Sequence, residues 1–361
     1  MFTVKVNLNE NSYDIVVGSD ILGDLGKTIK ASQIGRDAVV ITNPVIKRLH
    51  GKKLNASLKK AGLSVKFLVV PDGEKSKSVS MAFRLIDEIA SYSINKEVFI
   101  IAFGGGVIGD LAGFVAAIYK RGIPFIQVPT TFLAQIDSSI GGKVAVDLPA
   151  GKNLIGAFYQ PKLVWSDVDL LSTLTKRQVR NGLAEAVKYG IICEKFLFDY
   201  IEQNVQKVFS FNPRVLSEIV YNCSGIKARV VMNDEKETKG VRTILNFGHT
   251  AGHAIEAASK FRYHHGEAVA LGMCIAADIS KRLGLIGKKE VMHITKVLED
   301  IELPTQIKKI SFLQIMKHMQ YDKKFRAGKN RFVLMTSIGS VKVIEGIDER
   351  IITSAIKAFM G

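Results

Sequence analysis

The 361-residue chain has few cysteines: Cys193, Cys223 and Cys274 are the only three, and no two of them form a C-x-x-C pair. Cysteines this few and this widely spaced exclude a disulfide framework and indicate a reducing compartment. The first residues alternate as in a strand, and they lack the basic and then apolar pattern of a secretory leader. We therefore expect a cytoplasmic protein.

Long apolar runs are also scarce, and only residues 98–119 could pass for a membrane span. This run contains three consecutive glycines (104–106), then Gly109 and Asp110 near its centre. A carboxylate at the middle of a bilayer is costly. A buried strand, a glycine loop and a buried helix explain the run better, so we expect no membrane partner.

Acidic residues are outnumbered: 34 Asp and Glu against 50 Lys and Arg give a formal net charge of +16. Such an excess can serve nucleic acid, an anionic membrane surface or a small anionic ligand. The basic residues occur in short pairs such as Lys52-Lys53 and Lys288-Lys289, without a long basic run interleaved with aromatic residues. We expect an anionic small-molecule substrate and no nucleic acid. One substrate site does not explain the whole charge.

Two patterns of secondary structure divide the chain. In the first part β-rich runs (3–7, 13–17, 38–42, 65–70, 98–102 and 125–128) alternate with helical patterns (after Asn43-Pro44, 78–92 and 112–119). This alternation predicts a mainly parallel sheet with helices on both faces. Later, helical patterns dominate (178–192, 196–204, 213–231, 249–259, 268–283 and 288–299), with one β-like pair at 332–335 and 341–343. We predict an α/β Rossmann-like N-terminal domain (1–173) and a mainly α-helical C-terminal domain (174–361).

A glycine-rich segment follows the run at 98–102. Gly104, Gly106 and Gly109 fit the G-x-G-x-x-G spacing, in which glycines let the backbone approach a pyrophosphate at a helix N-terminus. The segment lies after residue 100, and Lys120 and Arg121 stand where a ribose-binding acid would be expected. A tight strand-to-helix turn without a ligand explains these glycines equally well.

Four of the seven histidines fall within seventeen residues. His249 and His253 are separated by four positions and therefore share a helix face, and His264-His265 follow. Thr250 occupies the position of the general-base Glu in the metalloprotease motif H-E-x-x-H. Two imidazoles with a carboxylate such as Glu185 suit Zn²⁺ and leave a coordination position open. A single histidine would more often be a satisfied core or surface residue, but this clustering favours a metal.

Polar loops carry cations beside glycines, at 119–122, 137–143 and 151–153. Such cations suit phosphate or carboxylate oxygens, although each loop alone could simply be solvated. From the residues themselves we infer a two-domain enzyme with a nucleotide-type loop, a zinc site and an acidic, phosphorylated substrate. The simplest class that fits is a metal-dependent polyol dehydrogenase.

Segments along nearly the whole chain resemble the 3-dehydroquinate synthase family. They are PDGEK (71–75), GGGVIGD (104–110), PTT (129–131), DSSIGGK (137–143), VDLP (146–149), GKN (151–153), GLAEAVKYG (182–190), LNFGH (245–249), HGEAV (265–269) and YDKK (321–324). The resemblance implies a homodimer with an N-terminal NAD domain and a C-terminal zinc domain, in which Co²⁺ could replace Zn²⁺. It implies Glu185, His249 and His265 as metal ligands, which overrides the pairing of His249 with His253.

The resemblance also implies roles for the polar residues. Asp137 and Lys188 would contact substrate hydroxyls, and Lys227 and Arg242 the substrate carboxylate. The substrate phosphate would be held by Lys143, Asn153, Asn246, His253, one of Lys323 and Lys324, and Arg121 from the partner subunit. The residues expected to bind NAD are Asp72, Gly73, Glu74, Lys75, Ser76, Lys77, Gly106, Val107, Ile108, Gly109, Asp110, Thr130, Thr131, Lys143, Lys152, Leu170, Leu171, Ser172 and Thr173.

The activity that the resemblance implies is that of a carbon–oxygen lyase of the shikimate pathway. It would convert 3-deoxy-D-arabino-heptulosonate 7-phosphate to 3-dehydroquinate and phosphate through transient oxidation by NAD, β-elimination, reduction, ring opening and aldol closure. The rivals are a related sugar-phosphate cyclase that acts on sedoheptulose 7-phosphate or glucose 6-phosphate, and a polyol or glycerol-phosphate dehydrogenase. Lys227 and Arg242 favour an acidic substrate over the related cyclases.

Overall fold

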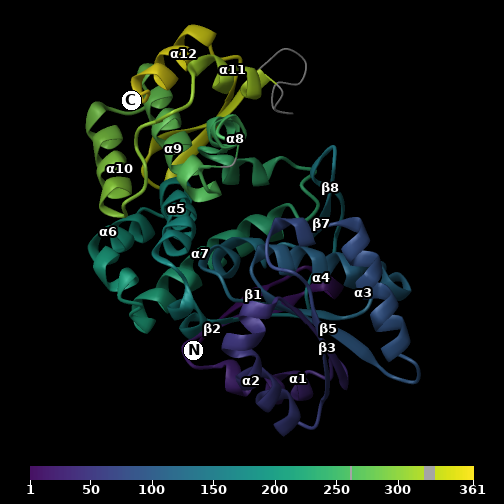
Figure 1. Cartoon of the computed structure of the whole chain (residues 1–361). Helices are drawn as coiled ribbons and strands as arrows, with labels where there is room; N and C mark the ends of the chain where they lie inside the picture. The colour runs from purple at the N-terminus through teal and green to yellow at the C-terminus, as the bar shows by residue number, and fades with distance from the viewer. Residues whose placement is uncertain (261, 321–329) are drawn as a thin grey trace. The chain divides into compact units, whose positions relative to one another are not determined.

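The computed structural model describes residues 1–260, 262–320 and 330–361. The chain forms two compact units: Met1–Thr175 with Phe211–Lys236, and Lys176–Ser210 with Glu237–Gly361 (Figure 1). The two units differ from the predicted division at 173/174 chiefly in one helix, α7 (Pro213–Asn233), which belongs to the first unit. Helical periodicity identified α7 as a helix, but periodicity does not indicate which surface a helix covers.

The first unit is built on a seven-stranded sheet with the order β1-β2-β9-β6-β5-β3-β4. The strands are β1 (Phe2–Val6), β2 (Tyr13–Gly18), β3 (Asp37–Thr42), β4 (Ser64–Val69), β5 (Val98–Gly104), β6 (Phe125–Pro129) and β9 (Leu163–Asp167). Only the β1–β2 pair is antiparallel, and the other pairs are parallel. A parallel sheet must be covered on both faces, and its inner strands β9, β6, β5 and β3 are accordingly almost entirely buried.

Strand β5 shows how the two faces are filled. Every residue of β5 is buried. Ile100 and Ala102 pack with α3 (Val79–Tyr92) and α4 (Gly106–Ile118), whereas Ile101 and Phe103 pack with α1 (Leu25–Ala31) and α2 (Pro44–Lys60). Alternate side chains therefore serve two separate cores, as the two-residue period of a strand requires.

Helix α7 covers the antiparallel end of the sheet. It packs on β1 and β2, and the ring of Tyr221 stacks on that of Phe2 with centroids 4.9 Å apart. A separate hairpin, β7 (Lys143–Leu148) and β8 (Gly151–Phe158), packs against α4 through buried Val144 and Val146. The hairpin carries several of the predicted site residues.

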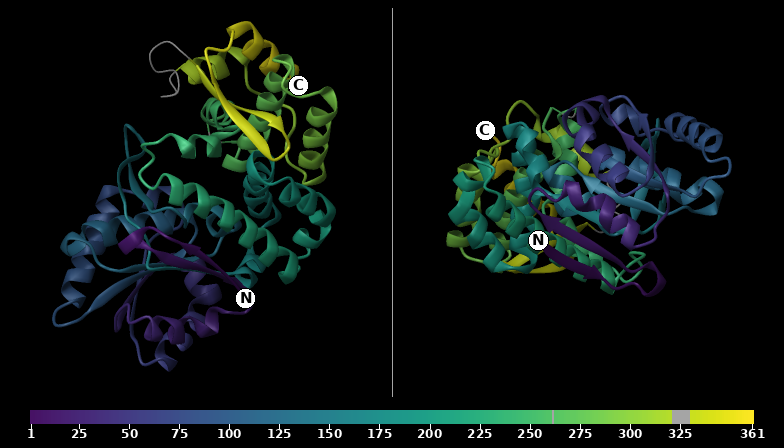
Figure 2. Two further views of the ribbon diagram at one scale, coloured as in Figure 1. Left: turned by 180° about the vertical axis from the view of Figure 1, so that it is seen from behind. Right: turned by 90° about the horizontal axis from the view of Figure 1, so that it is seen from below.

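The second unit is mainly helical. Its helices are α5 (Lys176–Cys193), α6 (Lys195–Phe209), α8 (His249–Ala258), α9 (His265–Arg282), α10 (Lys288–Asp300), α11 (Phe312–Gln320) and α12 (Glu349–Ala358). An antiparallel ribbon of β10 (Arg331–Ser337) and β11 (Ser340–Glu345), yellow in the left view of Figure 2, packs on α9 and α5. Helix α9 lies at the centre, since nearly every residue of its middle turns is buried.

The predicted fold class is confirmed for both parts of the chain. The run at 98–119 is β5, a glycine turn and α4, and none of the described helices combines the length and apolarity of a membrane span. Helix α4 begins six residues before the predicted start, because glycines at 106 and 109 hid its first turn. The sequence prediction missed α1, β7, β8, β9, α11 and α12.

Candidate functional site

The glycine segment forms a strand-to-helix turn in the first unit. β5 ends at Gly104 and α4 begins at Gly106, as the motif predicts. A Cβ at Gly109 would lie 2.9 Å from Oε1 of Gln127, so this glycine allows α4 to pack closely on the sheet. A Cβ at Gly106 would lie 3.0 Å from Oγ of Ser138. The turn thus has the close approaches that a dinucleotide-type turn uses.

A charged network adjoins the first turn of α4. The ammonium of Lys77 forms an ion pair with Asp110 and donates a hydrogen bond to Oδ1 of Asn153. Burial raises the pKa of the Asp110 carboxyl, and the charge of Lys77 opposes this effect. Asn153 has a left-handed backbone (φ 56°), and its N–H donates to Asp147 Oδ1 at 2.8 Å. The predicted cofactor and phosphate residues Lys77, Asp110 and Asn153 are therefore in direct contact.

Other predicted cofactor residues lie at the ends of parallel strands in the same unit. Asp72 accepts a hydrogen bond from Asn43 at 2.6 Å, beyond β4 and β3. Thr130 follows β6, and its buried Oγ1 has no hydrogen-bond partner among the described residues. Residues Val168–Thr173 form a 3₁₀ turn after β9. In this turn Oγ1 of Thr173 lies 3.1 Å from Nε2 of His50. The carboxyl ends of parallel strands are where open α/β sheets bind ligands.

Asp137 and Lys227 contact each other in the first unit. The Lys227 ammonium forms an ion pair with the Asp137 carboxylate and donates to the Asp137 carbonyl oxygen at 2.6 Å. Asp137 lies in a π-helical turn (Ala134–Ser138), and Lys227 is a buried residue of α7. π turns are often found at functional sites. Helix α7 thus brings the ammonium of Lys227 to the turn Ala134–Ser138, and this contact helps to attach α7 to the first unit.

Three helices of the second unit bring together a carboxylate and two imidazoles. Glu185 lies in the middle of α5, and His249 and His265 are the first residues of α8 and α9. Nε2 of His249 and Nε2 of His265 lie 3.4 and 3.3 Å from Oε1 of Glu185. One potential ligand atom from each of the three residues lies within 4.8 Å of the others. One ion could bind all three.

Both imidazoles are oriented for metal binding by a second contact. Nδ1 of His249 lies 3.1 Å from the carbonyl oxygen of Phe247, and Nδ1 of His265 lies 3.4 Å from Oε2 of Glu256. If each Nδ1 donates its proton to that oxygen, the Nε2 lone pair faces Glu185. This is the usual arrangement around metal-binding histidines.

The charges in this group are strongly coupled. Glu185 is fully buried, and neither of its oxygens has a hydrogen bond of regular geometry among the described residues, although Lys188 forms an ion pair with it. Burial opposes ionisation of Glu185, but Lys188 and both imidazoles outweigh it and hold the carboxyl pKa well below its usual range. A buried, ionised carboxylate with incomplete hydrogen bonding fits a cation ligand.

The pKa values of the two histidines shift in opposite directions. Burial lowers the pKa of His249 well below 6.5. Burial has the same tendency at His265, but hydrogen bonds to Glu185 and Glu256 raise the His265 pKa to about 10. Without a bound metal, His265 is therefore a cation between two carboxylates.

The other predicted residues that the structure describes in the second unit lie on α8 or in the turn that precedes it. The ring of His253 is exposed, with its centroid 5.2 Å from that of His249 and 6.0 Å from that of His265. Arg242 is buried in the 3₁₀ turn Val241–Asn246, which precedes α8. Asn246 ends that turn. The predicted phosphate contacts Lys323 and Lys324 lie outside the described residues.

The sequence reading missed one feature of this group, the support given by Glu256. Glu256 stands seven positions after His249 and therefore on the same face of α8, which is a signal that the sequence contained. The support from the Phe247 carbonyl could not have been found, because a main-chain oxygen leaves no mark in a sequence.

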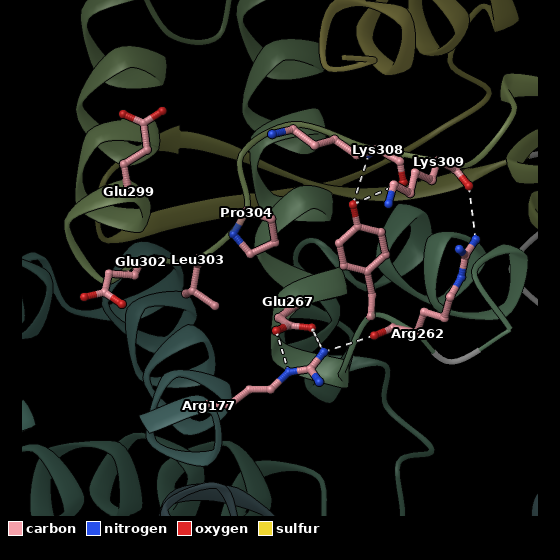
Figure 3. A pocket seen from close by; sticks show the side chains of 10 residues that line it. Arg177, Arg262, Glu267, Glu299, Glu302, Leu303, Pro304, Lys308 and Lys309 are labelled. Atoms are coloured by element: carbon pink, nitrogen blue, oxygen red, sulfur yellow. Dashed lines mark hydrogen bonds and ion pairs between the residues drawn. The ribbon is translucent and has the colours of Figure 1, made fainter. Parts of the chain in front are cut away.

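A separate cavity of about 670 Å³ lies in the second unit (Figure 3). Arg177 spans its base and binds both oxygens of Glu267 at 2.8 and 2.7 Å, and Tyr263 accepts a hydrogen bond from the Lys308 N–H at 3.0 Å. None of the predicted site residues that the structure describes lines the cavity. The charges of Arg177 and Glu267 neutralise each other, so the cavity is a weaker candidate for chemistry than the Glu185 group.

Comparisons with known proteins agree with this geometry. The family models described as 3-dehydroquinate synthase N-terminal and C-terminal match residues 67–181 and 182–325. The 3-dehydroquinate synthase of Pelotomaculum thermopropionicum is 43% identical over 363 aligned positions, which cover 100% of this chain and 98% of the relative.

Solved structures of related enzymes share the fold of nearly the whole chain. A 2-deoxy-scyllo-inosose synthase complexed with carbaglucose-6-phosphate, NAD⁺ and Co²⁺ has a TM-score of 0.90 and 28% identity, covering 99% of this chain and 100% of the other. A 2-epi-5-epi-valiolone synthase from Streptomyces hygroscopicus subsp. jinggangensis 5008, with NAD⁺ and Zn²⁺ bound, has a TM-score of 0.87 and 25% identity, covering 98% of each chain. The fold and the Glu185 group together define the class of the sugar-phosphate cyclases.

Within that class the full-length sequence match is decisive. The chain belongs to the 3-dehydroquinate synthase family.

The metal ligands can be tested by substitution. We expect Glu185→Gln to lower the affinity for Zn²⁺ or Co²⁺ at least a hundredfold, because the carboxylate is the only anion among the three predicted ligands. The matched control His253→Ala, which alters a neighbouring ring outside the three, should retain the metal. Equilibrium dialysis and the visible spectrum of the Co²⁺ protein report this directly. Loss of metal from His253→Ala with retention in Glu185→Gln would show that the ligand set is wrong.

Metal affinity should rise with pH, because His265 must lose its proton before Nε2 can bind an ion. Its pKa of about 10 predicts that the apparent association constant rises roughly tenfold per pH unit between pH 7 and 9. Since this pKa is raised above 6.5, the protonated ring stabilises the metal-free fold fully below pH 6.5, and that contribution is lost as the pH rises through about 10. Calorimetric titration in two buffers of different ionisation enthalpy should find one proton released per ion. A pH-independent affinity would contradict the protonation state.

Proposed function

We propose that this protein is a 3-dehydroquinate synthase, a carbon–oxygen lyase that converts 3-deoxy-D-arabino-heptulosonate 7-phosphate to 3-dehydroquinate and inorganic phosphate. The observation that carries the proposal is the buried group of Glu185, His249 and His265 in a chain 43% identical, over its full length, to a curated 3-dehydroquinate synthase. The group supplies a cation site of the kind that such a reaction needs, and the family match supplies the substrate.

Glu185, His249 and His265 would hold a divalent cation, Zn²⁺ or Co²⁺. The fit rests on the buried carboxylate and on the two Nδ1 contacts that aim both Nε2 atoms at it. The turn at Gly104–Gly106 and the network of Lys77 and Asp110 would hold NAD, as nucleotide-type turns do. When bound, the cation would favour ionisation of a substrate hydroxyl, and NAD would take and return a hydride.

The chain's own residues would bind and orient an anionic substrate. Lys143, Asn153, Asn246 and His253 would hold its phosphate, and Arg242 with Lys227 its carboxylate. Asp137 and Lys188 would accept or donate hydrogen bonds at its hydroxyls. Lys188 and Lys227 already form ion pairs with Glu185 and Asp137, so a bound substrate would meet pre-positioned charges.

The Lys227–Asp137 pair has a consequence for binding. Because Lys227 is paired with Asp137 in this structure, a substrate carboxylate must compete with Asp137 for the ammonium. The competition favours a substrate that offers Asp137 a hydroxyl in return. A sugar acid carries both groups, whereas glucose 6-phosphate and sedoheptulose 7-phosphate lack the carboxylate.

We further propose that the protein acts as a homodimer in the cytoplasm. Leu154, Phe158 and Ile118 expose about 40–46% of their surface on the β8 strand and at the end of α4, which pack together. Arg121 lies shortly after Ile118 in the sequence, is exposed and has a left-handed backbone (φ 66°). An exposed apolar surface beside such an arginine suits a second copy that receives Arg121. None of Cys193, Cys223 and Cys274 forms a disulfide, which fits a reducing compartment.

The activity predicts a specific balance of products. With the seven-carbon acid phosphate, catalytic NAD⁺ and Zn²⁺, we expect phosphate and 3-dehydroquinate in equal amounts, while NADH absorbance stays flat because the cofactor is regenerated. A chelator should abolish turnover. His253→Ala should lower kcat at least tenfold while the metal is retained.

Steady accumulation of NADH would instead indicate a dehydrogenase. Phosphate release from glucose 6-phosphate or sedoheptulose 7-phosphate, in preference to the acid, would indicate a related cyclase. Either result would overturn the proposed substrate without affecting the metal site.

A shared active site predicts complementation between two inactive variants. If Arg121 acts in the partner's site, co-expressed Arg121→Ala and His253→Ala chains form mixed dimers with one intact site, and about a quarter of the wild-type activity returns. Each variant alone should remain nearly inactive. Sedimentation velocity verifies that both variants dimerise. If the dimers mix and no activity returns, Arg121 acts within its own chain.

A further inference from the structure

The positive charge of this protein is concentrated in one part of the sequence. Residues 25–70 contain ten basic residues and one acidic residue, Asp37, for a net charge of +9. The whole chain carries +16, so the rest of it contributes only +7. A general bias toward lysine would spread the excess evenly, whereas this distribution places more than half of it in α1, β3, α2 and the start of β4.

Helix α2 contains most of these residues. It has six Lys and Arg, one His and no acidic residue. Gly51, Leu54, Ser57 and Leu58 form its buried side, and the cations lie on the opposite, exposed side. Helix α1 packs beside α2 in the first unit and adds the exposed Lys27 and Lys30 (Figures 1 and 2).

The helical period arranges these cations in two rows. Arg48, Lys52 and Lys59 follow one line along the helix, over about 16 Å at 1.5 Å per residue. Lys53 and Lys60 form a second line. Leu49, which is 44% exposed, and exposed Ala56 fall between the two rows. We call the surface formed by α2 between these rows, with Lys27 and Lys30, the basic face.

Most cations of the basic face have no partner among the residues that the structure describes. Lys53 pairs with Asp20. The other cations form no ion pair or hydrogen bond in the described part of the chain: Lys27, Lys30, Arg48, Lys52, Lys59 and Lys60. The helix dipole favours Lys59 and Lys60 at the end of α2, but it does not extend to Arg48 or Lys52. Neighbouring like charges repel, so the fold itself does not account for them.

We propose that the basic face binds an acidic segment of a partner protein. An apolar strip bordered by charge is the arrangement of a protein interface, with a dry centre and a polar rim. Residues 44–60 contain no Phe, Tyr or Trp, and the ring of His50 contacts Thr173, so the face offers no large aromatic ring on which nucleobases could stack. The strip of Leu49 and Ala56 is also too narrow for insertion into a membrane surface. The fitting partner carries Asp and Glu on either side of one or two apolar residues.

Charge complementarity would mainly raise the rate of association. Two rows of unpaired cations attract an acidic segment from a distance and fix its direction along α2, and salt weakens both effects. None of these cations belongs to the proposed active site. Binding of an acidic segment is therefore independent of the enzymatic activity.

The test compares two charge reversals of equal size on the full-length protein. The face variant is Lys52→Glu/Lys59→Glu/Lys60→Glu, and the control is Lys288→Glu/Lys289→Glu/Lys342→Glu, which changes exposed lysines of the second unit. The probe is a fluorescein-labelled 16-residue peptide of Glu pairs separated by single Leu residues, followed by anisotropy at 50 and 200 mM salt. We expect the face variant to bind at least tenfold more weakly and the control less than twofold more weakly.

A second comparison separates a protein partner from other polyanions. Leu49→Ser should weaken the binding of the leucine-containing peptide severalfold and leave the binding of an all-glutamate peptide unchanged. Equal losses in the face and control variants would show that only overall charge matters, and would overturn the proposal. Tighter binding of a 16-nucleotide single-stranded oligonucleotide or of phosphatidylserine vesicles, unaffected by Leu49→Ser, would also overturn it. Turnover with the proposed substrate should be unchanged in both variants and serves as the check on folding.

Discussion

The second unit depends on the burial of one carboxylate. Transferring an ionised Glu into a protein interior costs several kcal/mol unless nearby charges and hydrogen bonds compensate. At Glu185 the compensation comes from Lys188 on the same helix and from two imidazoles on two other helices. The carboxylate thereby determines which ends of α8 and α9 must meet. A divalent cation is the partner that would satisfy oxygens with no regular hydrogen bond.

The close packing of α8 and α9 makes this meeting possible. A Cβ at Gly272 of α9 would lie 1.9 Å from the carbonyl oxygen of Gly248, and one at Gly252 of α8 would lie 3.0 Å from that of Ala268. Gly248 also has a left-handed backbone (φ 76°), in the position just before His249. No side chain could occupy these positions, so the glycines let the two helices touch. The first residues of both helices, His249 and His265, then reach one carboxylate.

The sequence could predict the residue types of the site and most of the elements that carry them, but not all of their partners. Helical spacing alone paired His249 with His253, since four positions along a helix are always neighbours. The group that the structure brings together instead joins residues 80 positions from first to last, and no local period can predict it; the family resemblance did. Likewise α7 was recognisable as a helix from its period. Its packing on β1 and its delivery of Lys227 to Asp137 depend on contacts distant in sequence, which the period does not encode.

Charge has different roles in the two units. In the first unit, Lys77 with Asp110 and Lys227 with Asp137 form buried or half-buried pairs beside polar turns, so each cation is held in place before any anion arrives. The cations of α2 are exposed and far less constrained, and their effect decreases over a Debye length of about 8 Å at physiological salt. Pre-positioned pairs suit the recognition of a small substrate, where geometry determines specificity. Loose rows of lysine suit a larger partner, where the sum of many weak contacts determines affinity. The two kinds of charge therefore imply two kinds of ligand, and the size of the net charge follows from the second.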